Sequence, residues 1–195
     1  MQEKYNIDYS ISKITDEDIY LFNEGSHFHL YNKLGSHPIK KGKREGYYFA
    51  VWAPNANKVS VSGDFNGWNK IQHQLKPKGS SGIWEGFIEG VGEGSLYKYH
   101  IISNYGNYTV DKPDPYGLFF EKPPYTASVI YSSKYKWNDK HWMKSRAAAN
   151  KLDSPISIYE IHLGSWKRKI EEENRWLNYR ELAPLLTDYL KDTGF

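Results

Sequence analysis

The sequence predicts a mainly β protein: an immunoglobulin-like β-sandwich with short N-terminal helices, followed by the opening strand and helix of an incomplete (β/α)8 barrel. Three observations predict this fold class. Apolar residues alternate with a period of two over residues 47–131, and turn-forming residues repeatedly interrupt that pattern. Helix start and stop signals lie before residue 47. One strand pattern and one helix pattern fill residues 156–195.

These patterns divide the chain into four expected segments. Residues 1–46 form a helical lead-in and linker, residues 47–131 the β-sandwich, residues 132–155 a polar linker, and residues 156–195 the truncated start of a barrel. A single strand and a single helix cannot bury their apolar faces, because stable architectures need two packed layers. We therefore expect the chain to be the front part of a larger protein.

The lead-in contains two helical patterns and a basic run. Residues 15–18 carry the oxygen-bearing and acidic side chains of a helix start, and Gly25 follows the apolar residues of this first helix. A second helical piece is expected over residues 27–34. The basic residues within 36–46 could contact nucleic acid. A solvated linker is favoured, because the run is short and has no interleaved aromatic residues.

Seven short strand patterns follow, each with β-branched or aromatic residues. Their number and spacing are those of an immunoglobulin-like sandwich, although a chain without cysteine lacks the Cys…Trp…Cys pattern of true immunoglobulin domains. Residues 104–107 form a hairpin turn signal. The expected strands are residues 47–52, 59–61, 72–76, 83–88, 96–102, 108–110 and 127–131.

The last segment begins with an alternating run at residues 156–163, which predicts a strand, and it ends with a helix. Asn178 is the expected N-cap of that helix, and Thr193 with Gly194 marks its end. Pro184 lies inside the helical pattern, so we expect it to kink the helix or to delay its start. A strand followed by an amphipathic helix is the first unit of a parallel α/β fold such as a barrel.

Composition excludes several classes of protein. The absence of cysteine excludes disulfide bonds, cysteine nucleophiles and zinc–thiolate sites, and it fits a cytoplasmic location. A net charge of +3 does not demand nucleic acid as a partner. No segment reaches the roughly 20 apolar residues that span a bilayer, and no signal peptide pattern opens the chain. The histidines lack metal-binding spacing and no glycine-rich phosphate loop is present, so we expect no metal and no cofactor.

Several motifs, in a consistent order along the chain, carry a resemblance to a known family. Residues 49–69, which include Gly63-Asp64-Phe65-Asn66-Gly67-Trp68-Asn69, resemble the carbohydrate-binding module associated with glycogen and starch. Residues 22–35 resemble the lead-in helices of bacterial glycogen branching enzymes. Residues 114–117 are similar to the linker of those enzymes, and residues 159–166 to their first barrel strand and the loop after it. The resemblance covers nearly the whole chain.

The resemblance implies that the parent protein is a 1,4-α-glucan branching enzyme of the α-amylase superfamily. Such enzymes cleave an α-1,4 linkage and transfer the released chain to a 6-hydroxyl by a retaining mechanism that uses two carboxyl groups. The family's catalytic motifs match no position here, so we expect no catalytic residue in this chain and no activity of the chain alone. Its implied partners are α-1,4-glucan, such as glycogen or maltooligosaccharides, and the missing catalytic barrel. The alternative is a self-standing, non-catalytic glucan-binding or regulatory module.

Five residues are the predicted glucan-binding set. Trp68 follows a glycine-rich turn and matches the residue that stacks on a glucose ring in glucan-binding members, although it could instead pack on its own domain. Asn66 beside it can hydrogen-bond sugar hydroxyls. Lys98 aligns with a module lysine that binds hydroxyls, although a solvent-facing strand lysine is the alternative. Tyr105 stands where relatives place a second stacking Trp, which makes a two-platform site doubtful, and Asn107 is a polar candidate at the same turn.

Glu160 and His162 are the remaining candidates for chemistry. Alternation along residues 156–163 places both side chains on the same face of the expected strand. A Glu-x-His pair could perform acid–base catalysis, but a buried hydrogen-bonded pair that supports a barrel is the favoured interpretation.

Overall fold

The computed structural model describes residues 6–106, 108–149 and 151–195. The chain forms two compact units, the first ending at Lys134 and the second beginning at Tyr135. Each unit is described by itself. Among the described residues, no helix is long and apolar enough to cross a membrane.

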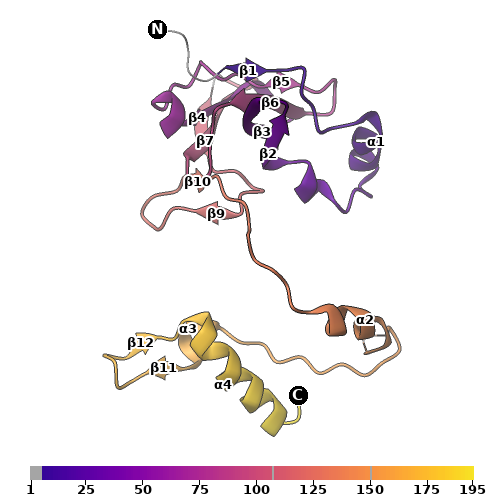
Figure 1. Ribbon diagram of the computed structural model, residues 1–195, viewed down its shortest axis with the longest axis vertical. Helices are drawn as coiled ribbons and strands as arrows, with labels where there is room; N and C mark the ends of the chain where they lie inside the picture. The colour runs from indigo at the N-terminus through magenta and orange to yellow at the C-terminus, as the bar shows by residue number, and fades with distance from the viewer. Residues whose placement is uncertain (1–5, 107, 150) are drawn as a thin grey trace. The chain divides into compact units, whose positions relative to one another are not determined.

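Two antiparallel sheets build the first unit (Figure 1). One sheet has the order β1-β6-β3-β2, with β5 on β6, and the other has the order β4-β7-β10-β9, with β8 on β7. The strands of the first sheet are β1 (Ile7–Asp8), β2 (Gly35–Lys41), β3 (Arg44–Trp52), β5 (Lys76–Pro77) and β6 (Ile83–Glu89). Those of the second are β4 (Ala56–Gly63), β7 (Leu96–Ser103), β8 (Thr109–Lys112), β9 (Phe119–Phe120) and β10 (Ser128–Val129).

The core between the sheets consists of the residues that alternate inward along β3, β4 and β7. Phe49 of β3 meets Tyr97 of β7 edge-to-face, with ring centroids 5.2 Å apart. Val59 and Val61 of β4 are fully buried beside them. This packing of two antiparallel sheets confirms the predicted sandwich and five of its strands at nearly the predicted positions.

The lead-in covers the other face of the first sheet. Tyr48 and Ala50 alternate with the core residues of β3, so they face the lead-in, where Ile11, Ile14 and Leu34 pack against them. Helix α1 (Asp16–Glu24) begins at a capping box between Thr15 and Asp18 and ends at Gly25 with φ 81°. These are the predicted start and stop. The expected second helix over residues 27–34 is only the 3-10 turn η1 (Leu30–Asn32).

The basic run at residues 36–46 is not a linker, and this prediction is wrong. Its residues belong to β2 and to the start of β3, which pair through a tight turn at Gly42, with φ 63°. Lys40 forms an ion pair with Glu45 across the hairpin, and Arg44 bonds both Asp8 and Glu89. β2 has a single neighbour, and an edge strand tolerates charged side chains that hide the apolar alternation.

The second unit contains α2 (Lys140–Ala149), α3 (Leu163–Trp166), a short hairpin of β11 (Arg168–Lys169) and β12 (Arg175–Trp176), and α4 (Tyr179–Asp192). Asn178 caps α4 as predicted, in a capping box with Glu181. Pro184 lies inside α4 and does not delay its start.

The strand expected at residues 156–163 is not formed. Residues 155–162, all of them described, have no regular secondary structure, and α3 begins at Leu163. A strand needs a neighbour to satisfy its backbone donors and acceptors, and no strand pairs with this segment in the described structure. Glu160 and His162 are exposed. His162 Nδ1 bonds Ser165 Oγ at 2.7 Å, so the expected buried Glu160–His162 pair is not present.

Candidate functional site

The candidate site begins where β4 ends at Gly63. The chain makes one 3-10 turn, η2 (Asp64–Asn66), and then places two successive residues in the left-handed region, Gly67 with φ 60° and Trp68 with φ 61°. The Trp68 amide donates to Gly63 O at 2.8 Å, which closes the turn. Glycine adopts this conformation freely, but a bulky residue such as Trp68 does so at a cost in free energy. Strain at an aromatic residue that is 41% exposed points to a functional position.

Asn66 holds this turn together. Its Oδ1 accepts from Gly63 N at 3.0 Å, and its Nδ2 contacts Val61 O at 3.0 Å, His73 Nδ1 at 2.9 Å and Asn69 O at 3.3 Å. Both ends of the amide are therefore occupied within the protein. These bonds give Asn66 a positioning role for the Trp68 turn, and its direct contact with a sugar stays a prediction.

An ion pair at Lys70, two residues after Trp68, attaches this segment to the outer face of the second sheet. Lys70 Nζ lies 2.8 Å from Asp111 Oδ2 on β8, and His100 Nδ1 on β7 lies 2.7 Å from Asp111 Oδ1. Burial raises the pKa of Asp111, but its hydrogen bonds to Lys70 and His100 outweigh that effect and lower it below the ordinary value. This ion network was missed from the sequence, because it requires the pairing of His100 with Asp111 across β7 and β8.

Lys98 lies on the same outer face, near Trp68. It is opposite Ser62 on β4, and Gly63 follows Ser62 at the start of the Trp68 turn. Its Nζ donates to Thr126 Oγ1 at 2.8 Å. An ammonium has three donors, so this bond leaves two for a ligand. The structure thus keeps Lys98 as a candidate beside Trp68.

Tyr105 does not share that site. Trp68 is anchored at Gly63, opposite Tyr97, whereas Tyr105 follows Ser103, opposite Ala56. A strand rises about 3.3 Å per residue, so the two ends of β7 are roughly 20 Å apart. Tyr105 is 71% exposed at the far end of the sandwich, and its distance from Trp68 argues against a compact two-platform site. Asn107, the fifth predicted residue, lies outside the described residues.

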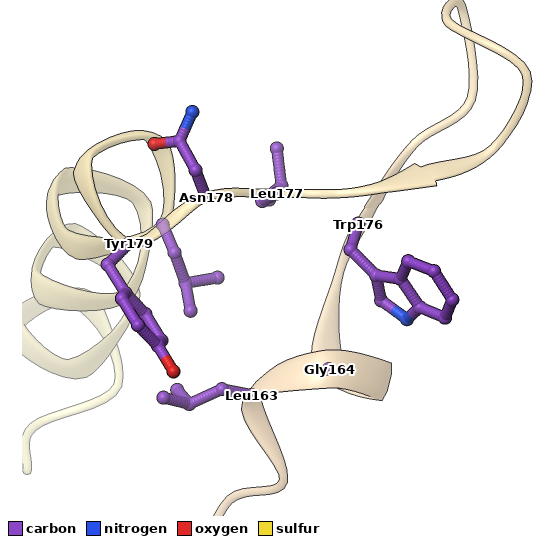
Figure 2. Close-up of a pocket in the computed structure, with 7 residues that line it drawn as sticks. Leu163, Gly164, Trp176, Leu177, Asn178 and Tyr179 are labelled. Carbon is purple, nitrogen blue, oxygen red and sulfur yellow. The ribbon is translucent and has the colours of Figure 1, made fainter. Parts of the chain in front are cut away.

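The second unit contains a cavity with a mainly apolar lining. It measures about 330 Å³ and lies between α3 and the start of α4, where the Tyr179 ring reaches toward Leu163 and the Asn178 amide points away (Figure 2). The amide is committed to the helix cap. The lining contains no carboxylate and no histidine, and Tyr179 is its one titratable side chain. Its lining residues are Leu163, Gly164, Trp176, Leu177, Asn178, Tyr179 and Leu182.

Comparisons with known proteins show which family this part of the chain resembles. Residues 33–117 match the family described as carbohydrate-binding module 48 (isoamylase N-terminal domain). The 1,4-alpha-glucan branching enzyme GlgB of Aquifex aeolicus is 53% identical over 185 residues, which are 94% of this chain and 29% of that enzyme. The chain belongs to the branching enzyme family, as an N-terminal portion. The GlgB of Albidiferax ferrireducens is 52% identical over 183 residues, covering 93% of this chain and 28% of that enzyme.

A solved pullulanase from Bacillus acidopullulyticus is 24% identical, with a TM-score of 0.38, and the match covers 52% of this chain and 12% of that one. The branching enzyme portion described here spans less than a third of the length of the two GlgB relatives. Within it, the residues that match the carbohydrate-binding family include β4, β7 and the Trp68 turn. Trp68 and Lys98 therefore both lie in the carbohydrate-binding module.

Proposed function

We propose that this chain is the glucan-binding and barrel-supporting part of a 1,4-α-glucan branching enzyme, and that the Trp68 ring is its platform for a glucosyl residue. The single observation that carries this proposal is the Trp68 turn. A left-handed backbone, closed by Gly63 and braced by the Asn66 amide, fixes the main chain that carries a partly exposed indole. A rigid platform loses little conformational entropy when a ligand binds.

The chemistry of the surroundings suits a neutral sugar. A pyranose ring has an apolar C–H face that packs on an aromatic ring, and hydroxyls at its rim that need hydrogen-bond partners. Trp68 supplies the face, and Lys98 has donors left for hydroxyl oxygens. The glucan class follows from the similarity to branching enzymes, since neither side chain alone distinguishes glucose from other sugars.

For the whole protein we infer the branching reaction. An α-1,4 linkage is cleaved and the released chain is transferred to a 6-hydroxyl, and the catalytic carboxyl groups belong to the remainder of the polypeptide. That remainder is the proposed protein partner of this chain. Nucleic acid, membrane, metal and cofactor play no part in the proposal, and the cytoplasmic location expected from the sequence stays a prediction.

Glucan binding is tested by titrating the chain with maltoheptaose, followed by tryptophan fluorescence and calorimetry. Stacking on a single platform should give a Kd between about 1 mM and 1 μM. Trp68→Ala should abolish the binding that depends on this platform. The matched control is Tyr105→Ala, which removes an exposed aromatic ring from the opposite end of the sandwich and should leave the Trp68-dependent fluorescence change intact. A folded wild-type chain that does not bind would refute the platform.

The catalytic part of the proposal is tested with iodine-stained amylose. The chain alone should leave the absorption spectrum unchanged, because no catalytic residue is assigned to it. A spectral shift produced by the purified chain would contradict this assignment.

A further inference from the structure

We propose that a small cavity beside Trp52, distinct from the Trp68 turn, is a second saccharide site, which takes one glucosyl ring. The inference rests on the proposed glucan-binding function. The cavity measures about 240 Å³ and is formed by both sheets together with the segment after β8. Its lining residues are Val51, Trp52, Tyr99, Ile101, Lys112, Pro113 and Pro115.

The aromatic wall of the cavity, Trp52, lies away from the Trp68 turn. Trp52 is the last residue of β3, and the turn that follows contains Asn55, whose carbonyl accepts from Asn104 N at 2.9 Å. Asn104 immediately precedes Tyr105. Trp52 therefore lies at the Tyr105 end of the sandwich, whereas Trp68 is anchored at the other end of β4.

The wall formed by the two prolines is fixed by the residue between them. Asp114 is 1% exposed, and its Oδ2 accepts from Tyr97 Oη at 2.6 Å and from Tyr99 Oη at 3.2 Å. Its Oδ1 accepts from Tyr116 N, and its own amide donates to Ser128 Oγ, both at 2.8 Å. Pro113 and Pro115 flank this anchor and have ring-restricted backbones, so the wall is formed before any ligand arrives.

The aromatic wall is also held in place. The Trp52 ring meets Phe22 of α1 edge-to-face, with centroids 5.9 Å apart and an interplanar angle of 71°. Trp52 is still 54% exposed, which is more than Trp68. Val51, Tyr99 and Ile101 form an apolar floor, so the cavity combines a supported indole face with an apolar base.

Lys112 supplies the polar group of the cavity. It is the last residue of β8 and is exposed, and its side chain forms no hydrogen bond or ion pair with any described residue. A single ammonium without an arginine is a weak anchor for a phosphate, and the absence of a carboxylate from the lining disfavours a cation. An indole face, an apolar floor and three free donors are instead complementary to the C–H face and hydroxyls of a pyranose.

The size of the cavity limits the occupant to one ring. Pockets for drug-sized ligands measure roughly 300–1,000 Å³, and this cavity is smaller. A glucan chain would place a terminal or single glucosyl residue there. On a branched polymer, two separate sites on one module would engage neighbouring chains, and the second contact would benefit from a high effective concentration.

The test follows the indole Nε1–H resonances of Trp52 and Trp68 by NMR in the 15N-labelled chain during titration with maltotriose. Trp52→Phe and Trp68→Ala assign the two resonances. Both should shift, with separate binding curves, and the Trp52 shift should persist in Trp68→Ala. Lys112→Met should raise the Kd read at Trp52 about five- to tenfold, because a charged hydrogen bond is lost, and leave the Trp68 curve unchanged. Lys58→Met, at an exposed position of β4, is the matched control and should change neither curve.

The outcomes separate the two proposals. A Trp52 resonance that stays still while Trp68 saturates overturns the second site and leaves the Trp68 platform intact. A Trp52 resonance that shifts while Trp68 does not supports the second site and refutes the platform. Equal affinities at Trp52 for Lys112→Met and the wild type, in variants with a native amide spectrum, overturn the role of Lys112 and with it the site as described.

Discussion

The Tyr97 hydroxyl donates a hydrogen bond of 2.6 Å to the carboxylate of Asp114, and both side chains are buried. This bond ties the proline-containing segment after β8 to the centre of the second sheet. Burial raises the pKa of both groups above their ordinary values, because water no longer stabilises their charged forms. The hydrogen bond from Tyr97 stabilises the charged carboxylate and so offsets part of the rise in the pKa of Asp114.

Asp114→Asn should lower the free energy of unfolding by about 1–3 kcal/mol at neutral pH, because the amide cannot accept all three hydrogen bonds. The folded pKa of Asp114 is raised, so the stability that depends on its protonation is complete below the unfolded value near 3.8 and is lost as the pH rises through the folded value. The difference in free energy of unfolding between the wild type and Asp114→Asn should therefore grow as the pH falls from neutrality toward 4.

Denaturant unfolding from pH 7 to pH 2 measures this trend, because the range has to extend below the unfolded pKa of an aspartate near 3.8. Asp111→Asn is the control with the opposite sign. The folded pKa of Asp111 is lowered, so its contribution is present above the unfolded value and is lost as the pH falls below it. Parallel pH trends for the two variants would contradict the assignment.

Trp68→Gly should be more stable than Trp68→Ala by about 1 kcal/mol, because glycine adopts the left-handed backbone without the clash that any Cβ introduces. Both variants lose the same ring, so the difference between them reports the backbone strain. Thermal unfolding of the two variants measures the difference in stability. A maltoheptaose titration of each variant measures glucan binding. Both variants should bind glucan poorly, and equal stabilities would show that the turn is relaxed.

Asn66→Ala should destabilise the first unit by about 3 kcal/mol, since it leaves Gly63 N and His73 without the Asn66 amide. It should also weaken maltoheptaose binding, because the Trp68 turn is no longer braced. Asn69→Ala is the milder control. Its Oδ1 accepts only from exposed backbone amides, at Ile71 and Gln72, and its loss should cost about 1 kcal/mol or less. Full glucan affinity in a folded Asn66→Ala variant would contradict the positioning role.

Gly46→Ala should destabilise the sandwich by about 3 kcal/mol or more. A Cβ at this position of β3 would lie 2.2 Å from Ile88 O and 2.8 Å from Glu89 Cα, so β6 would have to move. At Gly92 a Cβ would meet no atom within 4 Å, and its φ is not positive. Gly92→Ala should therefore be neutral or slightly stabilising in the same chemical denaturation experiment. A tolerated Gly46→Ala would mean that β3 and β6 are more loosely paired than described.

The features that the sequence predicted correctly are local ones. The capping box at Thr15, the cap at Asn178 and the alternation of residues 47–52 and 96–102 depend on neighbours within a few positions of the same chain. Such patterns predict the same local structure whichever distant residues pack against them. The motif around Trp68 was found for the same reason, since its glycines and its aromatic residue are contiguous.

Contacts between distant residues decided the rest. The pattern of residues 36–46 predicts a linker, but pairing with β3 makes this segment the edge strand β2. The bonds of Asn66 to Val61 and His73 cannot be predicted from the sequence, because they exist only after the turn has folded. The run at residues 156–163 has the alternation of a strand but no described partner strand, and it does not form a strand.

By itself the sequence determined the periodicity, the caps and the family, which are local or contiguous properties. Only the tertiary structure decided strand pairing, the separation of Trp68 from Tyr105 and the cavity beside Trp52, because hydrogen bonds and packing across the sheets join residues that are far apart in the chain.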